Sequence, residues 1–475
     1  MSESQGPLWS WRATDLSEGI LSGSISCEEV AESCLARIEA VNPQVNAIVD
    51  MIPAGEVMAA ARRADSDIRR GLSLGPLHGI PVTVKINVDM KGRATTNGVP
   101  AFSGLFAEED SASVANLRRA GAIILGRTNV PAFSTRYFTD NELYGRTVNP
   151  WSAHITPGGS SGGAAVAVAT GMGAIAHAND RAGSIRYPAY CCGVYGLRPT
   201  PGRLPSYNAT AKEERSITAQ LFSVQGPMAR SAEDLRLGMD ALGARDPRDP
   251  WWVPVEEPKV PTPLRVAMMP VVAGMNVLPE VSAAVRRAGR CLADAGFVVE
   301  ELAAPRIGDA AELYFSLLAT EANTTPLSPI AQFGGEAARK AREGTLAYRP
   351  PLRGQAAYMS ALATRTAFIR EISLFLEGFP LVLMPVSCRP PASVDSDQQG
   401  VDSVRELLDA QHPLVSISLL GLPSLVAPVG IVEGVPAGVQ LISARFCEAN
   451  CLAAGKALEV GIPPAFPPAD LPLGV

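Results

Sequence analysis

Residues 158–170 of the chain read GGSSGGAAVAVAT, a run of glycine and serine that leads into small apolar residues. The apolar part, residues 164–169, has no polar face, which predicts a helix that is packed on all sides. Ser160 and Ser161 stand at the start of this helix, where unpaired backbone N–H groups can point at their hydroxyls. The run therefore predicts a buried helix with two polar side chains held at its N-terminal end.

The sequence around this run alternates between two kinds of segment. Between residues 75 and 202, short apolar strands such as 122–125 alternate with glycine-bounded helices such as 162–170. This alternation is typical of layered α/β folds with a largely buried sheet. We therefore expect an α/β fold: a single large domain with a central mixed, mostly parallel twisted sheet that helices cover on both faces.

A lysine ends one of the predicted strands. Residues 75–85 read GPLHGIPVTVK, a turn rich in glycine and proline followed by a β-branched apolar run that ends at Lys85. Burial at the end of such a strand disfavours the charged form of the lysine and lowers its pKa. Because a neutral lysine can accept a proton, Lys85 is a candidate base.

A further serine, Ser184, lies in residues 180–188, which read DRAGSIRYP. A serine hydroxyl is a poor nucleophile until a neighbouring base takes its proton. Two glycine-flanked serines and a buried lysine point to a hydrolase that moves protons between hydroxyls. His177 offers a rival base that Asp180 could orient, although the members of a catalytic triad usually come from separate segments.

The stretch from residue 77 to residue 202 closely resembles the amidase signature family of serine hydrolases. Every constrained position of the family's glycine- and serine-rich signature is met between Gly158 and Pro188. Looser matches at 129–131, 145–151 and 434–442 extend the resemblance over most of the chain.

The resemblance implies that Ser184 is the nucleophile, Ser160 the bridging serine and Lys85 the base. Neutral Lys85 would take a proton from Ser160, which takes one from Ser184 as Ser184 attacks the carbonyl carbon. The relay then runs backwards to protonate the departing amine, and water releases the acid from the acyl-enzyme by the same route. The resemblance also implies a cis peptide bond between Gly159 and Ser160.

The loop before the nucleophile would form the oxyanion hole from the backbone N–H groups of Arg181, Ala182, Gly183 and Ser184. The family usually has a small uncharged residue at the position of Arg181 and most often glycine at that of Ala182. The guanidinium of Arg181 could recognise a substrate carboxylate, or it could point outward and pair with a carboxylate of the protein. The resemblance makes Asp180 structural, as an acceptor of hydrogen bonds that hold the loop.

The expected activity is hydrolysis of a carboxylic amide to acid and amine, with esters and anilides as further candidate substrates and with no cofactor. Ser134 and Tyr137 align with positions that line the acyl site in relatives, but either could equally be an ordinary core or surface residue. One alternative keeps the chemistry in the glutaminase-like A subunit of a tRNA-dependent amidotransferase. Another is a non-catalytic relative that binds a ligand or a protein.

Composition narrows the expected partners and location. A formal net charge of −6 supplies no basic field for a polyanion, so we expect a small-molecule amide partner and no nucleic acid. Eight scattered cysteines predict reduced thiols, and four histidines without ligand-like spacing predict no metal site. Residues 1–5 lack a secretory start and no apolar run is long enough for a membrane, so we expect a cytoplasmic enzyme. The sequence leaves open whether the chain forms a homodimer.

We expect four parts along the single domain. Residues 1–74 form a helical segment packed on the core, in which Ser26 and Glu29 make a capping box and 42–43 stop the first helix. The other three parts are a catalytic core at 75–240, a variable and mainly helical substrate-pocket region at 241–378, and a part that completes the core sheet at 379–475.

Overall fold

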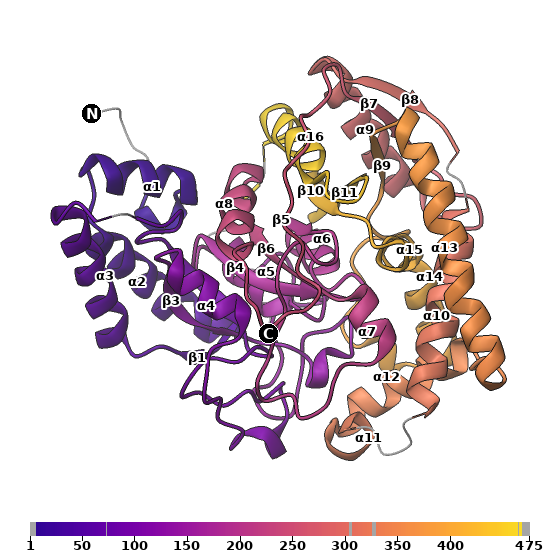
Figure 1. Cartoon of the computed structure of the whole chain (residues 1–475), viewed down its shortest axis with the longest axis horizontal. Coiled ribbons are helices and arrows are strands. Elements are labelled where there is room, and N and C mark those ends of the chain that lie inside the picture. Colours follow the sequence, from indigo (N-terminus) through magenta and orange to yellow (C-terminus); the bar gives the residue numbers. More distant parts are fainter. Residues whose placement is uncertain (1–5, 73, 304–305, 325–328, 464, 468–475) are drawn as a thin grey trace.

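The chain folds around one eleven-stranded sheet in the computed structural model (Figure 1). The structure describes residues 6–72, 74–303, 306–324, 329–463 and 465–467. Residues 1–5, on which part of the expected location rests, lie outside the described residues. The order of the strands across the sheet is β1 (Ile48–Met51), β3 (Ile123–Thr128), β2 (Pro81–Lys85), β4 (Ile175–Asp180), β6 (Val224–Ala229), β5 (Tyr195–Arg198), β10 (Ser424–Val432), β11 (Val435–Ser443), β9 (Leu381–Pro385), β7 (Arg265–Met268) and β8 (Val298–Glu301).

The strand directions confirm a mixed sheet. Strand β2 runs parallel to β3 and β4, and β7 runs parallel to β8 and β9, whereas the other neighbouring pairs are antiparallel. The expectation of a mostly parallel sheet is therefore wrong. Part of the reason lies in the tight turn between β10 and β11, where Glu433 and Gly434 both have positive φ, of 50° and 81°. A two-residue hairpin of this kind forces its strands to be antiparallel.

Helices cover both faces of the sheet, as expected. Helix α6 (Arg186–Cys192) approaches β11 closely at Gly438, where an added Cβ would lie 3.0 Å from the ring of Tyr190. Helix α16 (Glu448–Gly461) packs on β10, where a Cβ at Gly455 would lie 3.1 Å from Leu425. Leu425 pairs with Leu441, whose side chain points away from the face of Gly438 because residues alternate along a strand. The two helices therefore lie on opposite faces.

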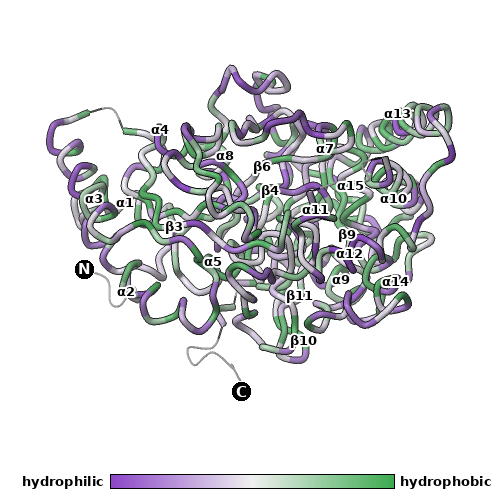
Figure 2. Tube along the Cα trace, turned by 90° about the horizontal axis from the view of Figure 1, so that it is seen from below, coloured by the Kyte–Doolittle hydropathy of each residue, from purple (hydrophilic) through white to green (hydrophobic). Residues whose placement is uncertain are grey.

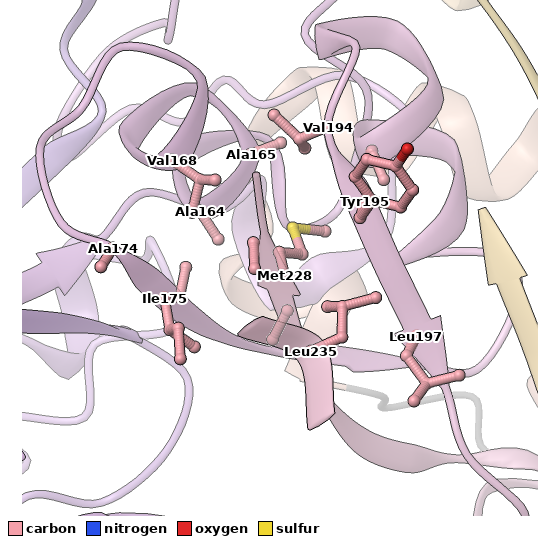
Figure 3. Packing of buried hydrophobic residues seen from close by; sticks show 14 of the residues in the cluster. Ala164, Ala165, Val168, Ala174, Ile175, Val194, Tyr195, Leu197, Met228 and Leu235 are labelled. Atoms are coloured by element: carbon pink, nitrogen blue, oxygen red, sulfur yellow. The ribbon is translucent and has the colours of Figure 1, made fainter. Parts of the chain in front are cut away.

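The helix after the glycine-serine run, α5 (Gly162–Ala169), is buried along its whole length. Figure 3 shows Ala164, Ala165 and Val168 in one hydrophobic cluster with Ile175 and Met228 of the sheet. The prediction of a helix packed on all sides is confirmed. This packing holds the residues before α5 in the centre of the molecule.

The N-terminal part contains α2 (Cys27–Val45) and α3 (Ala54–Arg69). Ser26 and Glu29 form the predicted capping box at the start of α2. The expected stop at 42–43 is wrong: the helix continues through Pro43 to Val45, and Asn46, with a φ of 50°, follows its last residue. Val45 is fully buried, and this burial offsets the hydrogen bond that a proline cannot donate.

The described residues between 303 and 378 are mainly helical, and their helices α10 and α13 lie on the opposite side of the molecule from α2 and α3 (Figure 1). A second hydrophobic cluster joins these helices to α15, and Figure 2 shows both hydrophobic and hydrophilic residues along α13. No helix among the described residues combines the length and apolar character that a bilayer span requires. The remaining helices are α1 (Ala13–Ser22), α4 (Ala112–Arg119), α7 (Ile217–Phe222), α8 (Ala232–Leu242), α9 (Pro279–Asp294), α10 (Ile307–Thr324), α11 (Pro329–Phe333), α12 (Gly335–Tyr348), α13 (Gly354–Gly378), α14 (Val401–Ala410) and α15 (His412–Leu420).

Candidate active site

Lys85 ends strand β2, all of whose residues are buried, so the predicted strand is confirmed. Its Nζ donates hydrogen bonds to Ser160 Oγ and to Asn179 Oδ1, both at 2.7 Å. Burial lowers the pKa of Lys85 to about 7, although the charge of Asp180 acts in the opposite direction. The amine of Lys85 is therefore buried, and its hydrogen-bond partners are neutral oxygen atoms.

Ser160 lies at the start of α5 and is almost fully buried. The peptide bond between Gly159 and Ser160 is cis. Gly159 is tightly enclosed, because an added Cβ would lie 2.3 Å from the carbonyl oxygen of Arg136. This enclosure places the hydroxyl of Ser160 within hydrogen-bonding distance of Lys85.

Ser184 lies in the turn between β4 and α6 and is half-buried. The preceding residue, Gly183, has a φ of 103°, and an added Cβ would lie 2.7 Å from Leu414. Both constraints favour glycine at this position. Among the described residues, the hydrogen bonds join Lys85 to Ser160 but do not extend from Ser160 to Ser184.

Asp180 holds the turn that carries Ser184. Its carboxylate accepts hydrogen bonds from the backbone N–H groups of Gly183, at 2.8 Å, and Ile185, at 3.2 Å. It also forms ion pairs with Arg186, at 3.0 Å, and Arg198, at 3.3 Å. Burial would raise the pKa of Asp180, but the charges of Arg186 and Arg198 hold it well below its usual range.

The N–H groups of the loop fall into two kinds. The N–H of Gly183 donates a hydrogen bond to Asp180. No described residue accepts a hydrogen bond from the N–H of Arg181, Ala182 or Ser184. The loop carbonyls are held from outside, since Tyr137 donates to the oxygen of Ala182 at 3.0 Å. The loop that carries Ser184 therefore has three N–H groups without a described acceptor.

Arg181 lies at the start of this loop, with 35% of its side chain exposed. Its Nη2 donates to Thr218 Oγ1 at 2.5 Å and lies 3.6 Å from Glu321 Oε2. The guanidinium is thus paired with a carboxylate of the protein, which was one of the two arrangements expected. Its Nε is buried, and no described residue accepts a hydrogen bond from it.

The remaining candidate residues lie on either side of these groups. Ser134 has a φ of 58° and accepts a hydrogen bond from Asn87 at 3.2 Å. Tyr137 is half-buried, and its ring meets that of Tyr187 edge-on, with centroids 5.6 Å apart. Ser134 therefore contacts the surroundings of Lys85, and Tyr137 contacts the loop of Ser184.

His177 lies in β4, where its Nε2 is 3.0 Å from Oε1 of Gln225. Burial lowers the pKa of His177 to about 4. The carboxylate of Asp180 is occupied by Arg186, Arg198 and backbone N–H groups rather than by the imidazole. The contacts of the rival histidine triad are therefore not formed in this structure.

The chain matches the family model for amidases over residues 29–452. The chain belongs to the amidase family. It is 43% identical over 458 residues to an indoleacetamide hydrolase of Bradyrhizobium diazoefficiens, across 96% of this chain and 87% of that protein. It is 32% identical over 469 residues to the A subunit of the glutamyl-tRNA(Gln) amidotransferase of Chloroflexus aurantiacus, across 93% and 94% of the two chains.

A solved structure of 6-aminohexanoate cyclic dimer hydrolase with its substrate superimposes on this amidase with a TM-score of 0.80. The two are 26% identical, and the match covers 96% of this chain and 98% of that one. The protein is therefore an amidohydrolase that acts on the C–N bond of amides, as the resemblance implied.

Sequence reasoning missed two residues of the candidate site, Asn179 and Asn87. Asn179 contacts Lys85 directly, and its Nδ2 donates to Asn87 Oδ1 at 3.0 Å. The available signal was a polar amide in the otherwise mainly apolar segment 175–179. Among the described residues, no group of histidine, cysteine and carboxylate side chains is arranged to hold a metal ion.

Proposed function

We propose that this amidase cleaves its substrate through an acyl-enzyme on Ser184, with Ser160 and Lys85 as the proton relay. The observation that carries the proposal is the 2.7 Å contact between Lys85 Nζ and Ser160 Oγ at a fully buried lysine. A pKa of about 7 lets this lysine take up a proton and return it at neutral pH.

In the proposed reaction, Ser184 Oγ attacks the carbonyl carbon while its proton passes to Ser160 and the proton of Ser160 passes to neutral Lys85. The tetrahedral intermediate collapses when the same relay protonates the amide nitrogen, and the amine leaves. Water then attacks the acyl-enzyme and gives a proton to the relay, which returns it to Ser184. The acid departs and Lys85 is neutral again.

The oxyanion of the intermediate would be bound by the N–H groups of Arg181, Ala182 and Ser184. Their support is the lack of a described acceptor for all three. Donors that are already positioned cost little reorganisation when charge develops on the carbonyl oxygen. Gly183, which was expected to contribute as well, holds the loop through Asp180 instead.

For the substrate we propose a neutral arylacetic amide, such as indole-3-acetamide. The identity of 43% to an indoleacetamide hydrolase supports this class. Tyr137 and Ala182 also pack against the second hydrophobic cluster, which contains Phe222 and Tyr314 and offers an apolar, aromatic wall beside the loop of Ser184. Ser134 and Tyr137 would border the acyl group. The guanidinium of Arg181 would border it too, with its charge matched by Glu321.

The second candidate is the A subunit of a tRNA-dependent amidotransferase, which the identity of 32% to such proteins supports. That role requires partner proteins, whereas a free-standing amidase works alone. The free thiols of all eight cysteines suit a reducing compartment, and we propose a cytoplasmic location for either role.

The test is a hydrolysis screen of the purified chain against indole-3-acetamide, phenylacetamide and glutamine, with Ser184→Ala as the blank. We expect turnover of the two arylacetamides and covalent labelling of Ser184, but not of the variant, by a fluorophosphonate. Turnover of glutamine alone, and only with co-purified partner proteins, would favour the amidotransferase role. Failure of the folded protein to react with the fluorophosphonate would contradict the proposed mechanism and support a non-catalytic relative.

A further inference from the structure

Glu321 of α10 faces Arg181, which lies in the loop that carries Ser184. Its Oε2 lies 3.6 Å from Nη2 of Arg181, and only 14% of its side chain is exposed. Thr218 of α7 donates to this carboxylate from its backbone N–H, at 2.9 Å, and from its hydroxyl, and Tyr358 of α13 donates at 2.7 Å. Residues of α7 and α13 thus hold this carboxylate of α10 beside Arg181.

These contacts keep the carboxylate charged. Burial would raise the pKa of Glu321, but hydrogen bonds from Thr218, Ser216 and Tyr358 lower it below its ordinary value. Arg215 adds a further positive charge close to Arg181, and burial is the main cause of the lowered pKa of Arg215. Arg215 also has the carboxylates of Asp249 and Glu214 nearby, whereas Arg181 would lose its ion-pair partner without Glu321.

Arg181 keeps unused donors despite this pairing. Its Nη2 is bonded to Thr218 and its Nε is buried, but no described residue accepts a hydrogen bond from its Nη1. The ion pair with Glu321 is longer than a hydrogen bond. A guanidinium with free donors binds carboxylates strongly, in a bidentate manner, when no other charge opposes them. The negative charge of Glu321 is what opposes a second carboxylate here.

We propose that Glu321 is the specificity-determining residue that makes the acyl site electrically neutral. The amidase then accepts uncharged acyl groups and rejects monoamides of dicarboxylic acids. This inference rests on the proposed function, because it assumes that the acyl group lies beside Ser184 and Arg181.

The test is the ratio of kcat/KM for a carboxylate-bearing amide to that for its neutral counterpart. Suitable pairs are 4-carboxyphenylacetamide with phenylacetamide, and succinamic acid with butyramide. Glu321→Gln keeps the shape of the side chain and removes the charge, so the ratio should rise on the order of tenfold. The rise should shrink as salt is added, because ions screen a partly exposed guanidinium.

Two further variants make the expectation specific. Arg181→Gln should lower the ratio, and the double variant with Glu321→Gln should return it towards the wild-type value. Glu312→Gln is the matched control, since it removes a carboxylate of the same helix that pairs with Arg349 instead. That control should leave the ratio unchanged.

A folded Glu321→Gln variant with the wild-type ratio, still labelled at Ser184 by a fluorophosphonate, would overturn the role of Glu321 and leave the mechanism intact. Lack of labelling in the wild-type protein would instead overturn the proposed function. If Glu321→Gln does not fold, Arg181→Gln decides the matter, because an unchanged or higher ratio in that variant contradicts the inference.

Discussion

Lys85 and Asp180 are both fully buried, yet the protein treats their charges in opposite ways. Among the described residues, Nζ of Lys85 donates hydrogen bonds to the neutral oxygen atoms of Ser160 and Asn179, and burial lowers the pKa of Lys85 to about 7. Asp180 lies between Arg186 and Arg198, which keep its pKa well below the usual range against the effect of burial. The amine of Lys85, at the proposed relay, thus has no carboxylate bonded to it. The carboxylate of Asp180, which holds the loop in shape, has two guanidinium partners.

The two environments lie next to each other in the chain. Asn179 and Asp180 are consecutive residues of β4, so their side chains point to opposite faces of the strand. The face of Asn179 meets Lys85, and the face of Asp180 meets the two arginines. One strand therefore separates a site in which a proton can move from a site in which charges are held.

The largest expected effect is the loss of amide hydrolysis when Lys85 is replaced. Lys85→Met removes the proposed base, so kcat for amide hydrolysis should fall by about 10²–10⁴-fold, the range typical of a lost general base. The measurement is kcat on phenylacetamide at neutral pH. His177→Ala is the comparison variant, because its imidazole bonds to Gln225 rather than to the relay. An equal loss in a folded His177→Ala would contradict the assignment of Lys85.

The matching change on the other side is Asp180→Asn, which leaves Arg186 and Arg198 buried without a counter-charge. Removing one partner of such a group should lower the free energy of unfolding by about 3–5 kcal/mol. Denaturant unfolding measures this loss. Asp309→Asn is the control, because its partner Arg306 is exposed and such pairs contribute about 0–1 kcal/mol. Equal losses in the two variants would show that Asp180 is not a structural centre.

The pH dependence of kcat/KM sharpens the comparison. The neutral form of Lys85 is the active one, so kcat/KM should rise with pH and level off above about 7. Asn179→Asp places a carboxylate against Nζ of Lys85, which favours the charged lysine and raises its pKa. The rising limb of the kcat/KM profile should therefore move to higher pH, by about one pH unit or more. A limb that stays in place in the variant would mean that another group controls the profile.

The last expected effect concerns stability. The pKa of Lys85 is about 7 in the folded state and near 10.5 when exposed, so between these values the unfolded chain binds more protons. This group therefore makes the protein less stable as pH falls from 10.5 to 7. Lys85→Met should stabilise the fold, most below pH 7 and least above 10.5. Thermal unfolding across this range measures the gain, and a gain that does not change with pH would contradict the lowered pKa.

Several local features could be predicted because they depend on neighbouring residues. The strand that ends at Lys85, the helix after Ser160 and the capping box of Ser26 follow from short patterns of apolar, glycine and polar residues. Strand directions could not be predicted in this way. Most antiparallel pairs of the sheet join segments far apart in the chain, such as β5 with β10.

The contacts around the site show the same limit. Nothing near Lys85 in the chain indicates Asn179, and nothing near Arg181 indicates Glu321, because each partner comes from a distant segment. The sequence by itself determined the family, the α/β class and the proposed Lys85, Ser160 and Ser184, since these rest on local pattern and a long motif. Only the tertiary structure decided which buried charges have counter-charges, because an ion pair or a pKa depends on groups that folding alone brings together.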